Sequence, residues 1–201
     1  MSPRKRTPEA AEQLRDTLIE HAQRIITRDG AKALTMRTLA AEAGCALGLP
    51  YKVFADRGEL VAAIVQAEFA RLAAAGEKLI TRAGAATVTD NLVWYAELLL
   101  DSPAVALAGE VMADRALAEA VAASAHQTGA GPVSFEAALS GYLAAEQHAG
   151  RVEGDVDTAA FGFLIAGAVH NLVMSGPAYL RPTRTKLRQH LAAVADQLQP
   201  R

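Results

Sequence analysis

Apolar residues recur along this chain at intervals of three or four, and breaks rich in glycine and proline interrupt the pattern. Leu14, Leu18, Ala22 and Ile25 show this spacing, which places them on one face of a helix. No segment alternates apolar and polar residues over the length of a strand. The pattern therefore predicts an all-α protein.

The breaks divide the chain into a series of predicted helices. Thr7 or Ser2 can cap the first helix, and Pro8 suits its first turn. Gly30 ends this helix, because glycine tolerates the left-handed conformation that closes a helix. The predicted segments are 8–29, 35–43, 46–54, 56–80, 88–101, 103–112, 115–128, 133–149, 156–175 and 183–198.

The composition bears on where such a protein would act. No apolar stretch reaches the roughly 18 residues that suggest a membrane span. The N-terminal sequence MSPRKRTPEAAEQLRD lacks the apolar core of a signal peptide. The single Cys45 cannot form an intrachain disulfide, which fits a reducing compartment. We therefore expect a cytoplasmic protein with no membrane partner.

The charge is unevenly distributed along the chain. Residues 1–57 hold more basic than acidic residues, whereas the remainder holds more acidic than basic ones. Such asymmetry suggests an anionic partner at the N-terminal end. In this same region two short predicted helices meet at Gly44 and follow a longer one. This is the arrangement of a helix-turn-helix, which places a recognition helix in the major groove of DNA.

The segment TMRTLAAEAGCALGLPYKVFADRGELV also resembles the DNA-binding region of TetR-family repressors. The similarity is close from Leu14 to Ala67 and only architectural over the rest of the chain. The residues that match the family pattern are Thr35, Leu39, Ala40, Ala43, Gly44, Gly48, Tyr51, Phe54, Arg57, Glu59 and Leu60.

Three positions depart from that pattern. Ala46 stands where the family usually has a serine cap, and Val53 replaces a more usual His or Tyr. Pro50 replaces a Leu, and proline fits only the first turn of a helix because it lacks an amide hydrogen. We therefore expect the recognition helix to begin near Leu49.

The resemblance implies a set of DNA contacts within residues 35–57. Hydroxyl and cationic side chains would hold phosphates, apolar ones would meet thymine methyl groups, and Arg37 would read bases. The predicted DNA-binding residues are Thr35, Arg37, Ala46, Leu47, Leu49, Tyr51, Lys52 and Arg57. Thr35 can equally be a plain helix cap, and the two leucines can equally pack under the first helix. A basic arm of Arg4, Lys5 and Arg6 can reach the DNA or be only a solvated tail.

The resemblance further implies a body that binds a small-molecule effector and forms a homodimer. Bulky residues with a few polar groups are typical of pocket linings, although each can be ordinary core. The predicted effector-binding residues are Trp94, Leu98, Met112, His126, Tyr142, His170, Asn171 and Met174. The segment FGFLIAGAVHNLVM is apolar nearly all round, which favours a dimer interface over an exposed helix, although it can also be the central core helix of a monomer. The predicted dimer interface is Phe135, Leu139, Leu143, Phe161, Leu164, Ile165, Ala168 and Leu172.

The sequence thus predicts a DNA-binding domain at 8–57 and an effector-binding and dimerisation domain at 58–198. We expect a homodimeric repressor of a palindromic operator that a small molecule releases. The histidines show no metal-ligand spacing, and no nucleophile or carboxylate pair stands out, so we expect no catalytic residue, metal or cofactor. Two alternatives remain: a helical binding protein that has lost operator binding, and a helical enzyme with a polar, acid-lined site.

Overall fold

The computed structural model describes residues 7–175 and 180–200, and all regular elements in these ranges are helical. The all-α prediction is therefore confirmed. Arg4, Lys5 and Arg6 lie outside the described residues. The elements are α1 (Pro8–Asp29), a 3-10 turn (Ala31–Ala33), α2 (Met36–Glu42), α3 (Pro50–Val53), α4 (Arg57–Thr81), α5 (Val88–Leu100), α6 (Pro103–Ala113), α7 (Arg115–Thr128), α8 (Pro132–His148), α9 (Thr158–Met174) and α10 (Arg184–Gln197).

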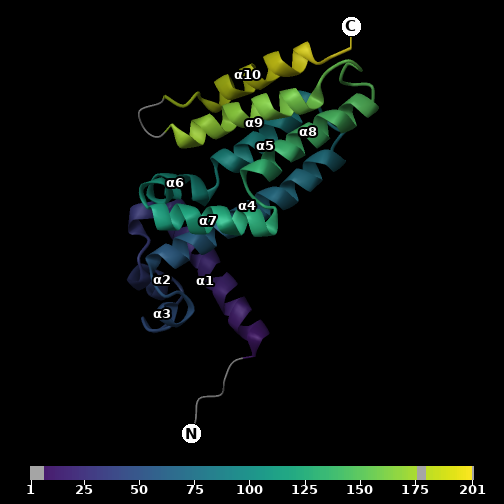
Figure 1. The fold of residues 1–201 in the computed structure, drawn as a ribbon. Coiled ribbons are helices and arrows are strands. Elements are labelled where there is room, and N and C mark those ends of the chain that lie inside the picture. The colour runs from purple at the N-terminus through teal and green to yellow at the C-terminus, as the bar shows by residue number, and fades with distance from the viewer. Residues whose placement is uncertain (1–6, 176–179, 201) are drawn as a thin grey trace.

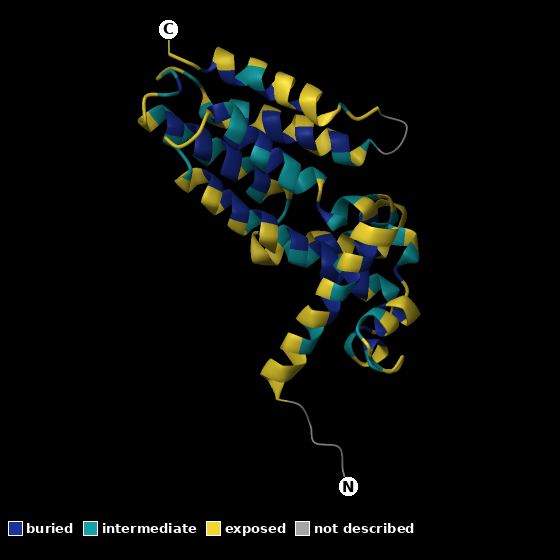
Figure 2. Ribbon diagram, turned by 180° about the vertical axis from the view of Figure 1, so that it is seen from behind, coloured by how far each residue is buried: buried dark blue, intermediate teal, exposed yellow. Residues whose placement is uncertain are grey.

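Helix α1 begins and ends as its sequence predicts. The Thr7 hydroxyl accepts a hydrogen bond from the Ala10 amide at 3.3 Å, and Pro8 is the first helical residue. Gly30 ends the helix with a φ of 84° and donates its amide hydrogen to Ile26. The first turns of α1 are exposed and project away from the rest of the molecule (Figure 2).

Helix α4 connects the two ends of the molecule. Helices α1, α2 and α3 gather at one end, and α10 lies at the other (Figure 1). Leu60 and Ile64 of α4 pack into a core with α1 and α2, whereas Leu79 packs into a second core with α5, α8, α9 and α10. Leu107 of α6 and Leu117 of α7 belong to the first core. The N-terminal helices therefore share their core with the body.

Helices α8 and α9 pack closely against each other. A Cβ atom at Gly162 of α9 would lie only 2.8 Å from the Ser140 backbone nitrogen of α8. Glycine is therefore required for this approach. By contrast, a Cβ atom at Gly167, one turn further along α9, would meet nothing within 4 Å.

The chain turns sharply between α5 and α6. Ser102 caps α6 by accepting a hydrogen bond from the Ala104 amide at 3.2 Å, and Pro103 is the first helical residue. Within residues 7–175 and 180–200, no single helix has both the length and the apolarity of a membrane span. The chain bends by 52° between α5 and α6, and these two helices satisfy those criteria only when they are taken together.

Candidate DNA-binding surface and effector cavity

The turn between α2 and α3 is tight and well bonded. Gly44 has a φ of 61°, a conformation that favours glycine, and the Cys45 amide donates to the Ala40 carbonyl at 3.0 Å. At the other end of α2, Thr35 and Thr38 form a capping box, with reciprocal bonds of 3.0 and 2.9 Å. Thr35 is therefore the N-cap of α2, and its exposed position leaves room for a phosphate contact as well.

The recognition segment comprises residues 46–54. Its helix begins at Pro50, as the missing amide hydrogen of proline requires. The Leu49 amide donates to the Ala46 carbonyl at 2.8 Å, which forms a first turn, and Leu49 itself has helical φ and ψ. Pro50 is the first residue of α3. Phe54 follows α3 and is fully buried, which anchors the segment in the core.

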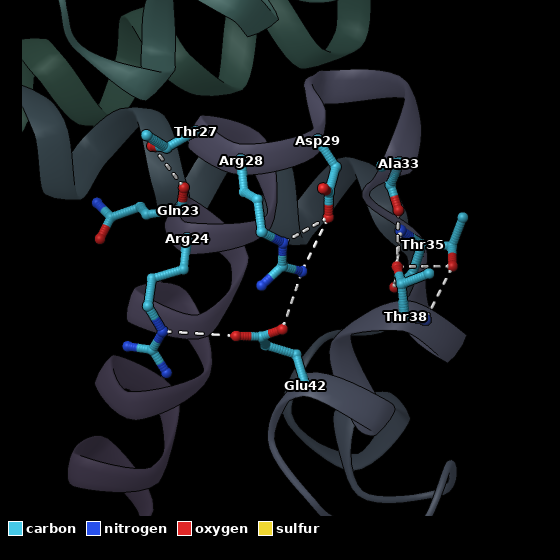
Figure 3. A network of polar contacts seen from close by, with 9 residues as sticks. All are labelled: Gln23, Arg24, Thr27, Arg28, Asp29, Ala33, Thr35, Thr38 and Glu42. Carbon is cyan, nitrogen blue, oxygen red and sulfur yellow. Dashed lines mark hydrogen bonds and ion pairs between the residues drawn. The ribbon is translucent and has the colours of Figure 1, made fainter.

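Ion pairs fix α1 against α2 and α4. Arg24 and Arg28 of α1 pair with Glu42 of α2, at 3.6 and 3.1 Å (Figure 3). The hydrogen bond from Arg28 lowers the pKa of Glu42. Arg15 of α1 donates to Glu59 of α4 at 3.0 Å. These contacts orient the recognition segment relative to the long helices.

Residues 35–52 expose both apolar and cationic side chains. Leu47 is 45% exposed and Tyr51 is 55% exposed, although both are large and largely apolar. Arg37 and Lys52 are exposed, and neither side chain has a hydrogen bond or ion pair with any described residue. Ala46 is exposed as well, whereas Leu49 is half-buried. This surface can accept an anionic, groove-bearing partner.

Arg57 lies apart from this surface. Its guanidinium donates to the carbonyls of Leu34 and Ala31, at 3.0 and 3.3 Å, and pairs with Glu110 of α6. These contacts occupy the guanidinium, and a DNA contact by Arg57 stays a prediction. Its observed role is to join the N-terminal helices to α6.

Glu68 of α4 makes a second connection to α6. Its carboxylate is buried and accepts hydrogen bonds from Gln23 of α1 at 2.8 Å, from Ser102 at 2.7 Å and from Arg71 at 2.8 Å. Since Ser102 caps α6, both ends of α6 are bonded through α4 to the N-terminal part of the chain, at Gln23 of α1 and at the Ala31 and Leu34 carbonyls.

A cavity of about 400 Å³ lies between α4 and α9, a size in the range of small-molecule sites. Helix α6 forms one wall through five residues and α9 another through six. The lining is almost entirely apolar. The lining residues are Val65, Phe69, Leu72, Leu99, Ala104, Val105, Ala108, Val111, Met112, Val121, Gly131, Pro132, Val133, Phe135, Glu136, Phe163, Ala166, Gly167, His170, Val173 and Met174.

Three of the predicted effector-binding residues line this cavity: Met112, His170 and Met174. The other five do not, and the effector-binding role of all eight residues stays a prediction. The Tyr142 hydroxyl donates to Glu146 at 2.6 Å and accepts from Asn91, and burial raises the pKa of Tyr142. The Trp94 ring packs against the Arg82 guanidinium, and Leu98 packs beside the core. His126 is exposed on α7, and Asn171 lies on the side of α9 that faces away from this cavity.

Sequence reasoning missed several lining residues. Phe69, Glu136 and Phe163 line the cavity and come from three different helices. Each of these residues lies in a stretch of helix that carries no distinctive sequence motif. The one available signal is Glu136, an acid in an otherwise apolar part of α8.

The predicted dimer residues divide into two groups. Leu164 is 60% exposed, Ala168 is exposed and Phe161 is half-buried. Buried in the core of a single chain are Phe135, Leu139, Leu143, Ile165 and Leu172, so they offer no surface to a partner and the prediction is corrected for them. Phe163, which the prediction omitted, is 60% exposed.

Comparisons with known proteins find the fold but no sequence relative. No family model and no curated protein matches the chain. Among solved structures, a TetR-family transcriptional regulator from Pectobacterium atrosepticum is 21% identical, with a TM-score of 0.64 and coverage of 98% of this chain and 99% of that one. A TetR transcriptional regulator from Streptomyces coelicolor is 23% identical, with a TM-score of 0.60 and coverage of 92% and 98%.

A TetR regulatory protein from Mycobacterium vanbaalenii is similar to the same degree, with 20% identity, a TM-score of 0.61 and coverage of 94% and 97%. These matches extend over the helix-turn-helix and the body together. They agree with the motif that residues 35–60 carry. The chain therefore has the fold of the TetR family of transcriptional regulators.

Proposed function

We propose that the protein is a homodimeric transcription regulator that binds a palindromic DNA operator through the segment from Thr35 to Lys52. The observation that carries this proposal is the set of side chains that residues 35–52 expose. They include Leu47 and Tyr51 together with the cations Arg37 and Lys52, which pair with no described residue. Apolar groups on a solvated tip are costly without a partner, and a major groove offers both phosphates and thymine methyl groups.

The proposal assigns the N-terminal helices, 8–57, to DNA and the remainder, 58–198, to effector binding and dimerisation. A second copy would cover the exposed apolar side of α9, where Phe163, Leu164 and Ala168 lie. A twofold contact of this kind would present two recognition helices to successive major grooves, about 10 base pairs apart.

Helix α6 supports a role for the cavity in regulation. It lines the cavity through five residues and is bonded at both ends to the helix-turn-helix side, through Glu110–Arg57 and through Ser102–Glu68–Gln23. A ligand that prefers one position of α6 would therefore favour one position of the recognition helices. We propose that such a ligand releases the operator.

The proposal is tested by selecting bound sequences from a randomised duplex library with the purified full-length chain at a stated salt concentration. The expected result is a palindrome with half-sites about one helical turn apart. Failure to enrich any sequence while non-specific binding persists would favour the alternative, a helical binding protein that has lost operator reading. Ala46, Pro50 and Val53, which depart from the family pattern, keep that alternative open.

In this proposal Lys52 contacts a DNA phosphate. We expect Lys52→Ala to weaken binding by a similar factor on the selected operator and on an unrelated duplex, because a phosphate contact carries no sequence information. The slope of log affinity against log salt should fall by about 1. Fluorescence anisotropy across a salt series measures both quantities.

Lys78→Ala is the matched control for this measurement. Lys78 is also exposed and helical, but it lies in the last turn of α4, in the body. It should leave affinity and salt slope unchanged. An unaltered salt slope in Lys52→Ala would remove Lys52 from the DNA interface.

A further inference from the structure

The cavity has an unusual distribution of charge. Glu136 and His170 are its only lining side chains with polar groups among the described residues, and no lysine or arginine lines it. The Glu136 carboxylate is half-buried and has no hydrogen bond or ion pair with any described residue. An acid beside an apolar cavity, without an internal partner, is available to a cation from outside.

Three phenylalanine rings line the same cavity. Phe69 comes from α4 and Phe163 from α9, whereas Phe135 of α8 is buried and its ring stacks on Tyr95. Aromatic faces attract cations, and the attraction is strongest where water is excluded. The rest of the lining is aliphatic or sulfur-containing and suits an apolar body.

We propose that this cavity binds a lipophilic cation, an apolar molecule that carries one ammonium-like group, with Glu136 as its counter-charge. The inference rests on the proposed role of the cavity as the effector site. The same chemistry disfavours a carboxylate or phosphate ligand, since an anion would face an acid and find no lysine or arginine in the lining.

The exposed edge of the cavity presents apolar side chains to a ligand that enters. Met112 is 58% exposed and Met174 is 37% exposed, and both line the cavity. Methionine side chains are flexible and polarisable, so they adapt to apolar ligands of different shape. The carboxylate, rather than the shape of the wall, therefore selects the ligand.

The test uses three ligands with the same ten-carbon chain and different head groups: decyltrimethylammonium, decanol and decyl sulfate. Isothermal titration calorimetry with the full-length protein at pH 8 gives the affinities, with the two ionic ligands below their micellar concentrations and decanol below its solubility limit. We expect the cation to bind about tenfold more tightly than the sulfate. In Glu136→Gln this preference should disappear, with about tenfold weaker binding of the cation and no change for decanol.

Two further variants separate the site from surface adsorption. Glu77→Gln removes an exposed acid of α4 that does not line the cavity, and it should bind all three ligands as the wild type does. Ala108→Phe places a ring in the space that α6 lines, and it should weaken all three. Circular dichroism melting confirms that each variant is folded.

The outcomes distinguish this inference from the proposed function. Equal or tighter binding of decyl sulfate, no binding of any of the three, or a cation affinity that Glu136→Gln leaves unchanged overturns the inference, while operator binding stands. Cation binding that depends on Glu136 in a protein that selects no operator supports the inference and rejects the regulator. Release of the operator by decyltrimethylammonium, but not by decyl sulfate, supports both.

Discussion

Glu59 illustrates how single side chains hold the recognition segment in place. Its carboxylate accepts a hydrogen bond from the Ala55 amide at 2.8 Å and another from Arg15 at 3.0 Å. These bonds, the amide bond most of all, hold the pKa of Glu59 below its usual value. A carboxylate with a lowered folded-state pKa stabilises the fold above its unfolded-state pKa, and this contribution is lost as the pH falls through the folded-state value.

We expect Glu59→Gln to be less stable than the wild type at pH 7, and the difference to shrink as the pH falls below about 4. Urea unfolding followed by circular dichroism at a series of pH values measures this. Glu20→Gln is the control, because Glu20 is exposed on α1 and has no bond with a described residue. A difference between wild type and Glu59→Gln that stays constant with pH would contradict the assignment.

For single residues, the sequence predicts the features that depend on neighbours in the chain. The cap at Thr35, the tight turn at Gly44 and the helix start around Pro50 depend on neighbours in the chain, and all three are observed. The contacts of Arg57 depend on Glu110, far along the chain, and no local pattern indicates such a partner. The same holds for the carboxylate of Glu68, whose partners come from α1 and α6.

Among the elements, the packing of α8 on α9 gives opposite expectations for two glycines of one helix. Gly162→Ala should destabilise the protein by roughly 1–3 kcal/mol, because its Cβ would press on the Ser140 backbone. Gly167→Ala should be neutral or stabilise by up to about 1 kcal/mol, since alanine is the better helix former and the space is open. Urea unfolding of both variants gives the two values. Equal effects would show that the close approach at Gly162 is not required.

Element boundaries follow from the sequence more closely than element orientation does. The predicted segments 88–101 and 115–128 correspond to Val88–Leu100 and Arg115–Thr128, because breaks and caps fix helix ends. Helix α9 is apolar on all sides, so its periodicity does not reveal which side faces the core. For this reason the predicted dimer residues include Ile165 and Leu172, which are buried, as well as Leu164, which is exposed.

For the molecule as a whole, the exposed side of α9 leads to a prediction about assembly. We expect Leu164→Glu to shift the protein to monomers, because burying an unpaired carboxylate in an apolar interface is costly. Operator affinity should fall with it, since one recognition helix reads only one half-site. Sedimentation equilibrium and anisotropy check the two effects. Ala193→Glu, on the exposed side of α10, is the control, and a Leu164→Glu variant that stays dimeric would place the interface elsewhere.

The shared core between α4, α6 and the N-terminal helices limits how this protein can be recombined. Leu107 and Leu117 complete the packing of the helix-turn-helix, and Gln23 and Arg57 bond it to the body. Joining residues 8–57 to the body of another protein would expose apolar surface and leave Gln23 without its partner, the buried Glu68. A stable chimera would therefore have to carry the matching faces of α6 and α7 with residues 8–57, so the exchangeable unit is larger than the helix-turn-helix.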